Sequence, residues 1–179
     1  MKVLILSDAH IPDREKEIPK DLREVIESNA PYDLVIYAGD LTGEEVLSYL
    51  KTLGDEVRAV RGNMDYLPLP EKITLELDGK KVLVLHGHQV RPRGNLKALS
   101  EIARREGAEV IIHGHLHVPL IDRVEGIVHL NPGSVTGSWG GYTLGGTPSF
   151  MELQLPSWRL KLYQLKGKEL QVYEKVLTK

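Results

Sequence analysis

Five short clusters of aspartate, asparagine and histidine in this sequence contain side chains that proteins use to bind divalent metal ions. In chain order they are Asp8-Ala9-His10, Gly39-Asp40, Gly62-Asn63, His86-Gly87-His88 and Gly114-His115-Leu116-His117. Oxygen and imidazole ligands without thiolate favour manganese first and leave iron, nickel, cobalt and zinc open. The set is larger than one ion can use. Two divalent ions that share a bridging carboxylate therefore fit better.

Each cluster has a plainer interpretation when it is taken alone. Asp8-Ala9-His10 would ordinarily be a turn or a helix cap, and Gly39-Asp40 a loop. An isolated pair such as His115 and His117 is more often incidental than metal-binding. All five clusters, however, follow an apparent strand in a chain without cysteine, and this joint pattern favours a metal site.

The elements that must position these clusters are short apolar strands. Strands are predicted over residues 2–7, 34–38, 57–60, 81–85 and 110–112. Because open α/β sheets gather ligands at the carboxyl ends of their strands, we expect the five clusters to converge on one edge. His115 and His117 are expected on the same side of an extended backbone.

Helices are predicted over residues 19–28 and 96–105, the second with Asn95 as its N-cap. Thr42 and Glu45 have the spacing of a capping box for a further helix that ends near Gly54. From Pro119 onward, short alternating segments predict antiparallel strands, which could pair within the chain or across subunits.

Bulk composition narrows the class of protein. A length of 179 residues predicts a single domain over 1–179. With 23 Lys and Arg against 25 Asp and Glu, the net charge of −2 does not indicate nucleic-acid binding. The absence of cysteine excludes disulfides, zinc fingers and thiol catalysis. The apolar run from Val3 to Leu6 is too short for a membrane span or signal peptide, so a cytoplasmic location is expected.

Together the five clusters resemble those of the calcineurin-like metallophosphoesterase superfamily, over residues 1 to about 155. The length, the His86-Gly87-His88 form and Asn131-Pro132-Gly133-Ser134 resemble its small bacterial and archaeal phosphodiesterases. The resemblance implies an α/β fold, a four-layer αββα sandwich of two mixed sheets flanked by helices. It also implies that Asp40 bridges two ions. One ion would be held by Asp8, His10, Asp40 and His117, and the other by Asp40, Asn63, His86 and His115.

The function implied is a phosphodiesterase that hydrolyses small phosphodiesters by in-line attack of a metal-bridging hydroxide. The cofactors would be two divalent ions, Mn²⁺ first and Ni²⁺, Fe²⁺, Co²⁺ or Zn²⁺ as alternatives. Asp40, Asn63 and His88 are the catalytic candidates. The partner expected is a small phosphodiester substrate, with no membrane, and relatives are often homo-oligomers.

One departure from the superfamily concerns the leaving group. Many members have a histidine directly after the asparagine, where this chain has Met64. Methionine cannot donate a proton, so we expect weak turnover of poor leaving groups and a preference for activated aryl diesters. His88 could replace the missing histidine, but a structural role for His88 is about as well supported.

A second departure lies in the glycine-rich loop from Gly133 to Gly146. Relatives often continue from the Asn-Pro-Gly-Ser motif to a proline-arginine pair, and no phosphate-binding arginine is evident at this place here. Trp139 or Tyr142 could stack on a substrate ring, although loop packing or a subunit contact is favoured. His113 and His129 are expected to be structural.

Two other functions compete with the phosphodiesterase. One is a nuclease of the same superfamily, which the short chain, Met64 and the lack of a basic stripe disfavour. The other is a catalytically weak interaction scaffold resembling the retromer subunit, which would not need the full ligand set.

Overall fold

The first strand, β1 (Lys2–Leu6), shows how the layers of the computed structural model arise. Successive side chains of a strand point to opposite faces, and both faces of β1 are buried. Val3 and Ile5 lie in a core between two sheets, whereas Leu4 and Leu6 lie in a second core beneath helices. The structure describes residues 1–177. The last two residues of the predicted domain, 178–179, lie outside the described residues.

The first sheet has six strands, with β1 near its middle. β1, β2 and β3 run parallel, and β9 pairs antiparallel with β1. In spatial order the strands are β11 (Glu169–Val176), β10 (Arg159–Lys166), β9 (Ser149–Gln154), β1, β2 (Leu34–Tyr37) and β3 (Val57–Ala59).

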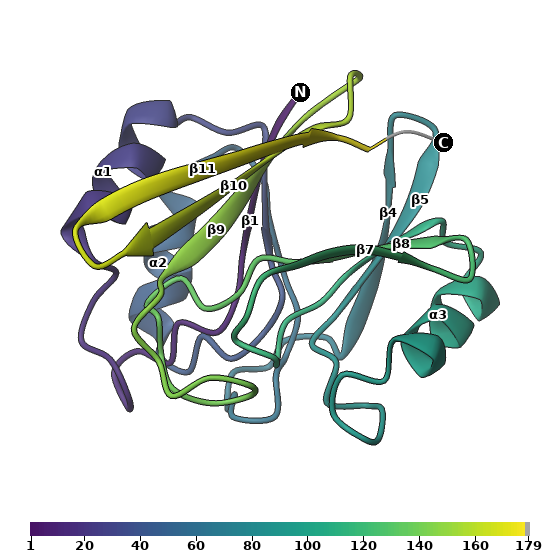
Figure 1. Cartoon of the computed structure of the whole chain (residues 1–179), viewed down its shortest axis with the longest axis horizontal. Coiled ribbons are helices and arrows are strands. Elements are labelled where there is room, and N and C mark those ends of the chain that lie inside the picture. The colour runs from purple at the N-terminus through teal and green to yellow at the C-terminus, as the bar shows by residue number, and fades with distance from the viewer. Residues whose placement is uncertain (178–179) are drawn as a thin grey trace.

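The second sheet has five strands and faces the first across the central core (Figure 1). β5, β6 and β8 are parallel, while β4 and β7 are antiparallel edges. In spatial order the strands are β4 (Lys72–Leu77), β5 (Lys80–Leu85), β6 (Val110–Ile112), β8 (Ile127–Asn131) and β7 (Leu120–Val124).

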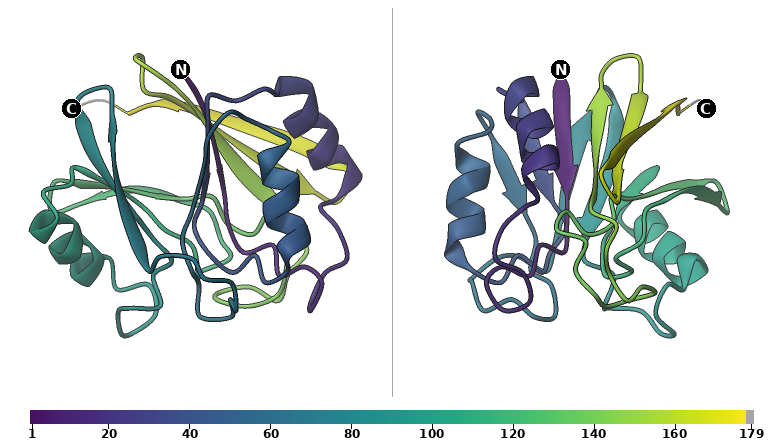
Figure 2. Two further views of the ribbon diagram at one scale, coloured as in Figure 1. Left: turned by 180° about the vertical axis from the view of Figure 1, so that it is seen from behind. Right: turned by 60° about the vertical axis from the view of Figure 1, so that its left-hand side comes forward.

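Helices cover both outer faces. α1 (Lys20–Asn29) and α2 (Glu44–Lys51) pack on the first sheet, and α3 (Leu96–Arg105) on the second. Figure 2 shows the resulting order of helix, sheet, sheet and helix from behind. The predicted four-layer sandwich of two mixed sheets is confirmed.

One predicted helix start is wrong. α2 has Gly43 at its N-cap and no side-chain cap, because Thr42 instead donates its hydroxyl to the Ile11 carbonyl at 2.8 Å. Asn95 does cap α3, accepting a hydrogen bond from the Ala98 N–H at 3.1 Å. Thr42 thus joins two loops and does not cap the start of α2.

The C-terminal strands pair within the chain, because β10 lies between β9 and β11. Within residues 1–177, the helices are too short or too polar to cross a membrane.

Candidate metal centre

The predicted ligands meet between the two sheets, at matching ends of both. Asp8, Asp40 and Asn63 follow β1, β2 and β3 of the first sheet, whereas the histidine clusters follow β5 and β6 of the second. The expectation of a single sheet edge is therefore wrong. The loops are joined by backbone hydrogen bonds from Asp8 to Gly39 and from Gly114 to His86.

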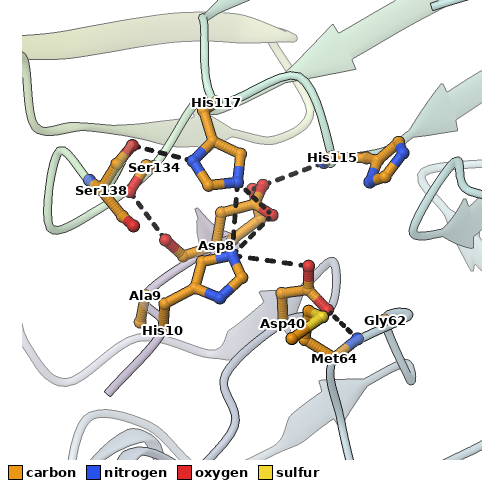
Figure 3. A network of polar contacts seen from close by, with 12 residues as sticks. Asp8, Ala9, His10, Asp40, Gly62, Met64, His115, His117, Ser134 and Ser138 are labelled. Carbon is orange, nitrogen blue, oxygen red and sulfur yellow. Dashed lines mark hydrogen bonds and ion pairs between the residues drawn. The ribbon is translucent and has the colours of Figure 1, made fainter. Parts of the chain in front are cut away.

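The first ligand group contains Asp8, His10 and His117, all buried. The Nε2 atoms of the two histidines lie 3.3 Å apart (Figure 3). His117 Nε2 lies 3.4 Å from Asp8 Oδ1, and His10 Nε2 lies 3.8 Å from the same oxygen. Asp8 Oδ2 accepts hydrogen bonds from Ser7 and the His115 N–H, whereas Asp8 Oδ1 is buried without a partner. That free oxygen faces the group.

The second ligand group contains Asp40, His86 and His115. Asp40 Oδ1 accepts a hydrogen bond from the Met64 N–H at 2.9 Å, which fixes the carboxylate. Asp40 Oδ2 then lies 3.1 Å from His86 Nε2 and 3.5 Å from His10 Nε2. One carboxylate oxygen therefore faces a histidine of each group. This is the position a bridging ligand needs.

The histidine tautomers direct lone pairs toward these oxygens. His86 Nδ1 lies 2.7 Å from the Ala38 carbonyl, and His117 Nδ1 lies 2.8 Å from the Ser138 carbonyl. A carbonyl can only accept, so Nδ1 carries the hydrogen in both rings. In the neutral rings, Nε2 then presents a lone pair to a carboxylate. Two acceptors facing each other favour a cation between them, and this backbone support is usual for metal-bound histidines.

Charge and burial shape the proton affinities of the same residues. Burial lowers the pKa of His10 to about 4, and burial together with the charges of His86 and Arg93 lowers that of His115 to about 3. Burial also disfavours a charged His86, but the attraction of Asp8 and Asp40 outweighs it and raises the pKa of His86 to about 9. A proton held there competes with a metal ion.

Backbone conformation separates His115 from His117. Both have positive φ values, 71° and 61°, so the segment is not extended and the expectation that they share one side of it is wrong. Their side chains instead enter different ligand groups. Asp8, His10 and Asp40 also have positive φ, a costly conformation outside glycine that persists where surrounding contacts fix it.

Gly62 and Gly114 allow the loops to approach the carboxylates. A Cβ atom on Gly62 would lie 2.1 Å from Asp40 Oδ1, and one on Gly114 would lie 2.7 Å from Asp8 Oδ2. Any side chain at either position would displace a candidate ligand.

Asp65 supports the loops that carry candidate ligands, a role that the sequence did not reveal. Its carboxylate accepts hydrogen bonds from the Asp40 and Gly62 N–H groups at 2.8 and 2.7 Å, and from the Thr42 N–H at 2.8 Å. It therefore ties the loop after β2 to the loop after β3. No motif spacing distinguishes such a residue from an ordinary loop aspartate.

Asn63 and His88 lie at the margin of the centre. Asn63 is exposed and lies between Gly62 and Met64, both next to Asp40. The ring of His88 lies 5.5 Å from that of His86 and 6.4 Å from that of His115. Its Nε2 faces Glu71 at 3.7 Å, and its Nδ1 is buried without a partner. The catalytic roles of both stay predictions.

Arg93 contacts His115 in a way that metal binding must break. The Arg93 Nε–H donates to His115 Nε2 at 3.0 Å, so that nitrogen acts as an acceptor and Nδ1 carries the hydrogen. A metal on Nε2 would take the same lone pair. A metal on Nδ1 would move the hydrogen to Nε2. Either way the Arg93 contact is lost.

Comparison with known proteins identifies relatives of this chain. Residues 1–153 match the family model of the calcineurin-like phosphoesterase superfamily domain. A probable metallophosphoesterase from Methanocaldococcus jannaschii is 44% identical over 136 residues, which are 76% of this chain and 69% of that protein.

Solved structures share the fold. Wild-type Vps29 from Entamoeba histolytica, complexed with zinc, is 31% identical with a TM-score of 0.89, covering 98% of this chain and 99% of that one. An archaeal phosphodiesterase has a TM-score of 0.67 at 23% identity, covering 99% of this chain and 100% of that one. The latter similarity shows the fold alone.

Proposed function

The chain belongs to the calcineurin-like phosphoesterase superfamily, and on this premise we propose that it is a dinuclear metal-dependent phosphodiesterase of small substrates. The observation that carries the proposal is the position of Asp40 Oδ2, which faces His10 of one ligand group and His86 of the other. The buried Asp8 Oδ1, which has no hydrogen-bond partner, supports it, because such an atom is costly without a ligand.

The residues fit two divalent ions. Asp8, His10, Asp40 and His117 would hold one, and Asp40, Asn63, His86 and His115 the other. When bound, the ions supply Lewis acidity that neutralises phosphate charge and activates water for attack on phosphorus. We propose manganese, and the zinc complex of the related Vps29 keeps zinc as an alternative.

The protein's own contribution is positioning. Asp65 and the Met64 N–H hold Asp40, while the Ala38 and Ser138 carbonyls orient His86 and His117. Asn63 is a neutral ligand, so it adds no negative charge opposite an anionic substrate.

The preference for diesters rests on the leaving-group side of the centre. Met64 cannot protonate a leaving group, and His88 has its Nε2 beside Glu71. We therefore propose faster hydrolysis of activated aryl diesters than of alkyl monoesters. The cytoplasmic location and any homo-oligomer stay predictions.

A substrate screen combined with metal analysis tests the function. Manganese-loaded protein should hydrolyse bis(p-nitrophenyl) phosphate, whereas Asp40→Asn should lose at least about a hundred-fold in kcat/KM and also lose metal. Asp55→Asn, in an exposed loop, is the matched control. Asp40→Asn with wild-type activity would rule out the bridging role.

The likeness to Vps29 favours the interaction scaffold as a second candidate. Because that Vps29 structure holds zinc, metal binding does not separate the two functions, but hydrolysis does. A metal-loaded wild-type protein that cleaves no mono- or diester, and no single-stranded oligonucleotide, would favour the scaffold.

A further inference from the structure

We propose that Arg14 and Trp139 form a substrate subsite beside the first ligand group, where the guanidinium binds a phosphate oxygen and the indole stacks on a planar group. This inference rests on the proposed function and narrows the substrate to phosphodiesters that carry an aromatic ring or a nucleobase. Arg14 comes from the loop after β1, and Trp139 from the glycine-rich loop.

Arg14 is fixed next to the ligands. Its backbone N–H donates to the His10 carbonyl at 2.9 Å, so it lies in a tight turn with that histidine. A Cβ atom on Gly140 would lie 2.9 Å from His117 Cε1 and 3.0 Å from Arg14 Nη1. The guanidinium and the His117 ring therefore lie close together against Gly140.

The guanidinium is held by contacts that leave its charge available. Arg14 Nη1 donates to the Trp139 carbonyl at 3.0 Å, and its Cζ lies 4.0 Å from the indole centroid. Among residues 1–177, no carboxylate forms an ion pair with Arg14. A preorganised guanidinium without a carboxylate partner is a good donor for phosphate oxygens.

Trp139 offers the second half of the subsite. Its side chain is 55% exposed, whereas the other tryptophan, Trp158, is 6% exposed. The guanidinium lies over one face of the indole, and the residue is more than half exposed. The arginine that the glycine-rich loop lacks is thus supplied by another segment and held by this loop.

The chemistry favours a substrate with a ring. Stacking of an aromatic side chain on a base or aryl group contributes about 1–3 kcal/mol. Arginine contacts to phosphate add charge-assisted hydrogen bonds. A diester with only alkyl groups would use Arg14 but not Trp139.

Binding of two phosphonates separates the two halves. Phenylphosphonate and methylphosphonate are titrated by calorimetry into manganese-loaded protein, so no turnover is needed. Trp139→Ala should weaken the binding of phenylphosphonate by at least about five-fold and leave the affinity for methylphosphonate within about two-fold of wild type. Arg14→Gln should weaken the binding of both phosphonates alike. Trp139→Phe should restore most of the phenylphosphonate affinity.

Arg105→Gln, an exposed position on α3, controls for the change in net charge. Equal losses of affinity for both ligands in Trp139→Ala would mean that Trp139 only supports the loop. Unchanged binding in Arg14→Gln would contradict the proposed contact between Arg14 and the phosphate. No binding of either phosphonate by wild type would overturn the subsite. Phosphonate binding without diester hydrolysis would contradict the proposed function while leaving the subsite intact.

Discussion

At the scale of single residues, the centre is defined by atoms that lack ordinary partners. Asp8 Oδ1 is buried and has no hydrogen-bond partner, although Asp8 Oδ2 is hydrogen-bonded, and His86 Nε2 faces the carboxylates of Asp40 and Asp8. A folded protein tolerates such groups where a ligand completes them. The residue types alone indicated this chemistry, and the structure adds which atom of each residue faces the others.

The raised pKa of His86 predicts that metal binding depends on pH. Below its pKa of about 9, the ring nitrogen that faces Asp40 holds a proton, which an ion must displace. The affinity for manganese should therefore rise with pH between about 6 and 9, by up to about ten-fold per unit for one released proton. Calorimetry in buffers of different ionisation enthalpy measures the protons released. An affinity that is flat over this range would contradict the account.

The sequence indicated which residues gather in the two groups, but it did not indicate the residues that support them. Aspartate, asparagine and histidine at strand ends form a recognisable pattern, and four of the histidines and both aspartates lie in the two groups. Asp65 and Arg14 were missed because their roles depend on loops that meet only in the fold. Their positions in the chain carry no spacing signal.

At the scale of elements, a buried chain of hydrogen bonds joins α3 to the loop after β6. Ser100 donates to the Val124 carbonyl, so its oxygen accepts the Nε2 hydrogen of His129 at 2.8 Å. His129 Nδ1 lies 3.3 Å from His113 Nε2, and His113 Nδ1 lies 3.4 Å from the Asn131 amide.

This series of hydrogen bonds ends beside the candidate metal centre. The Asn131 amide also donates to the Gly114 carbonyl at 2.9 Å, directly before the candidate ligand His115. Burial lowers the pKa of His113 to about 3 and that of His129 to about 4, so both rings stay neutral and each has one donor and one acceptor nitrogen. This agrees with the structural role expected for both.

Removing the Ser100 hydroxyl from this series of hydrogen bonds should destabilise the fold. Ser100→Ala leaves the His129 Nε2–H buried without an acceptor, which costs about 1–3 kcal/mol in the free energy of unfolding. Urea denaturation measures the change. Ser48→Ala, on the exposed side of α2, is a helical serine of the same type and should change stability little. Equal stability of the two variants would mean that the Ser100–His129 hydrogen bond contributes nothing measurable to the free energy of unfolding.

At the scale of the whole molecule, the candidate metal centre depends on the arrangement of two facing sheets (Figure 1), because each sheet carries some of the candidate ligands. Hydrophobic periodicity predicted the strands and two of the helices, because buried strands and amphipathic helices have distinct patterns. It could not reveal that the strands divide between two sheets, since strand order depends on long-range pairing. The resemblance to a known family supplied that information.

Anomalous diffraction from a manganese-soaked crystal tests the central claim of a dinuclear centre joined at Asp40. The account predicts two metal peaks about 3.5–4 Å apart, one beside Asp8, His10 and His117 and the other beside His86 and His115, with the Asp40 carboxylate contacting both. A single peak, or two peaks of which only one contacts Asp40, would contradict it.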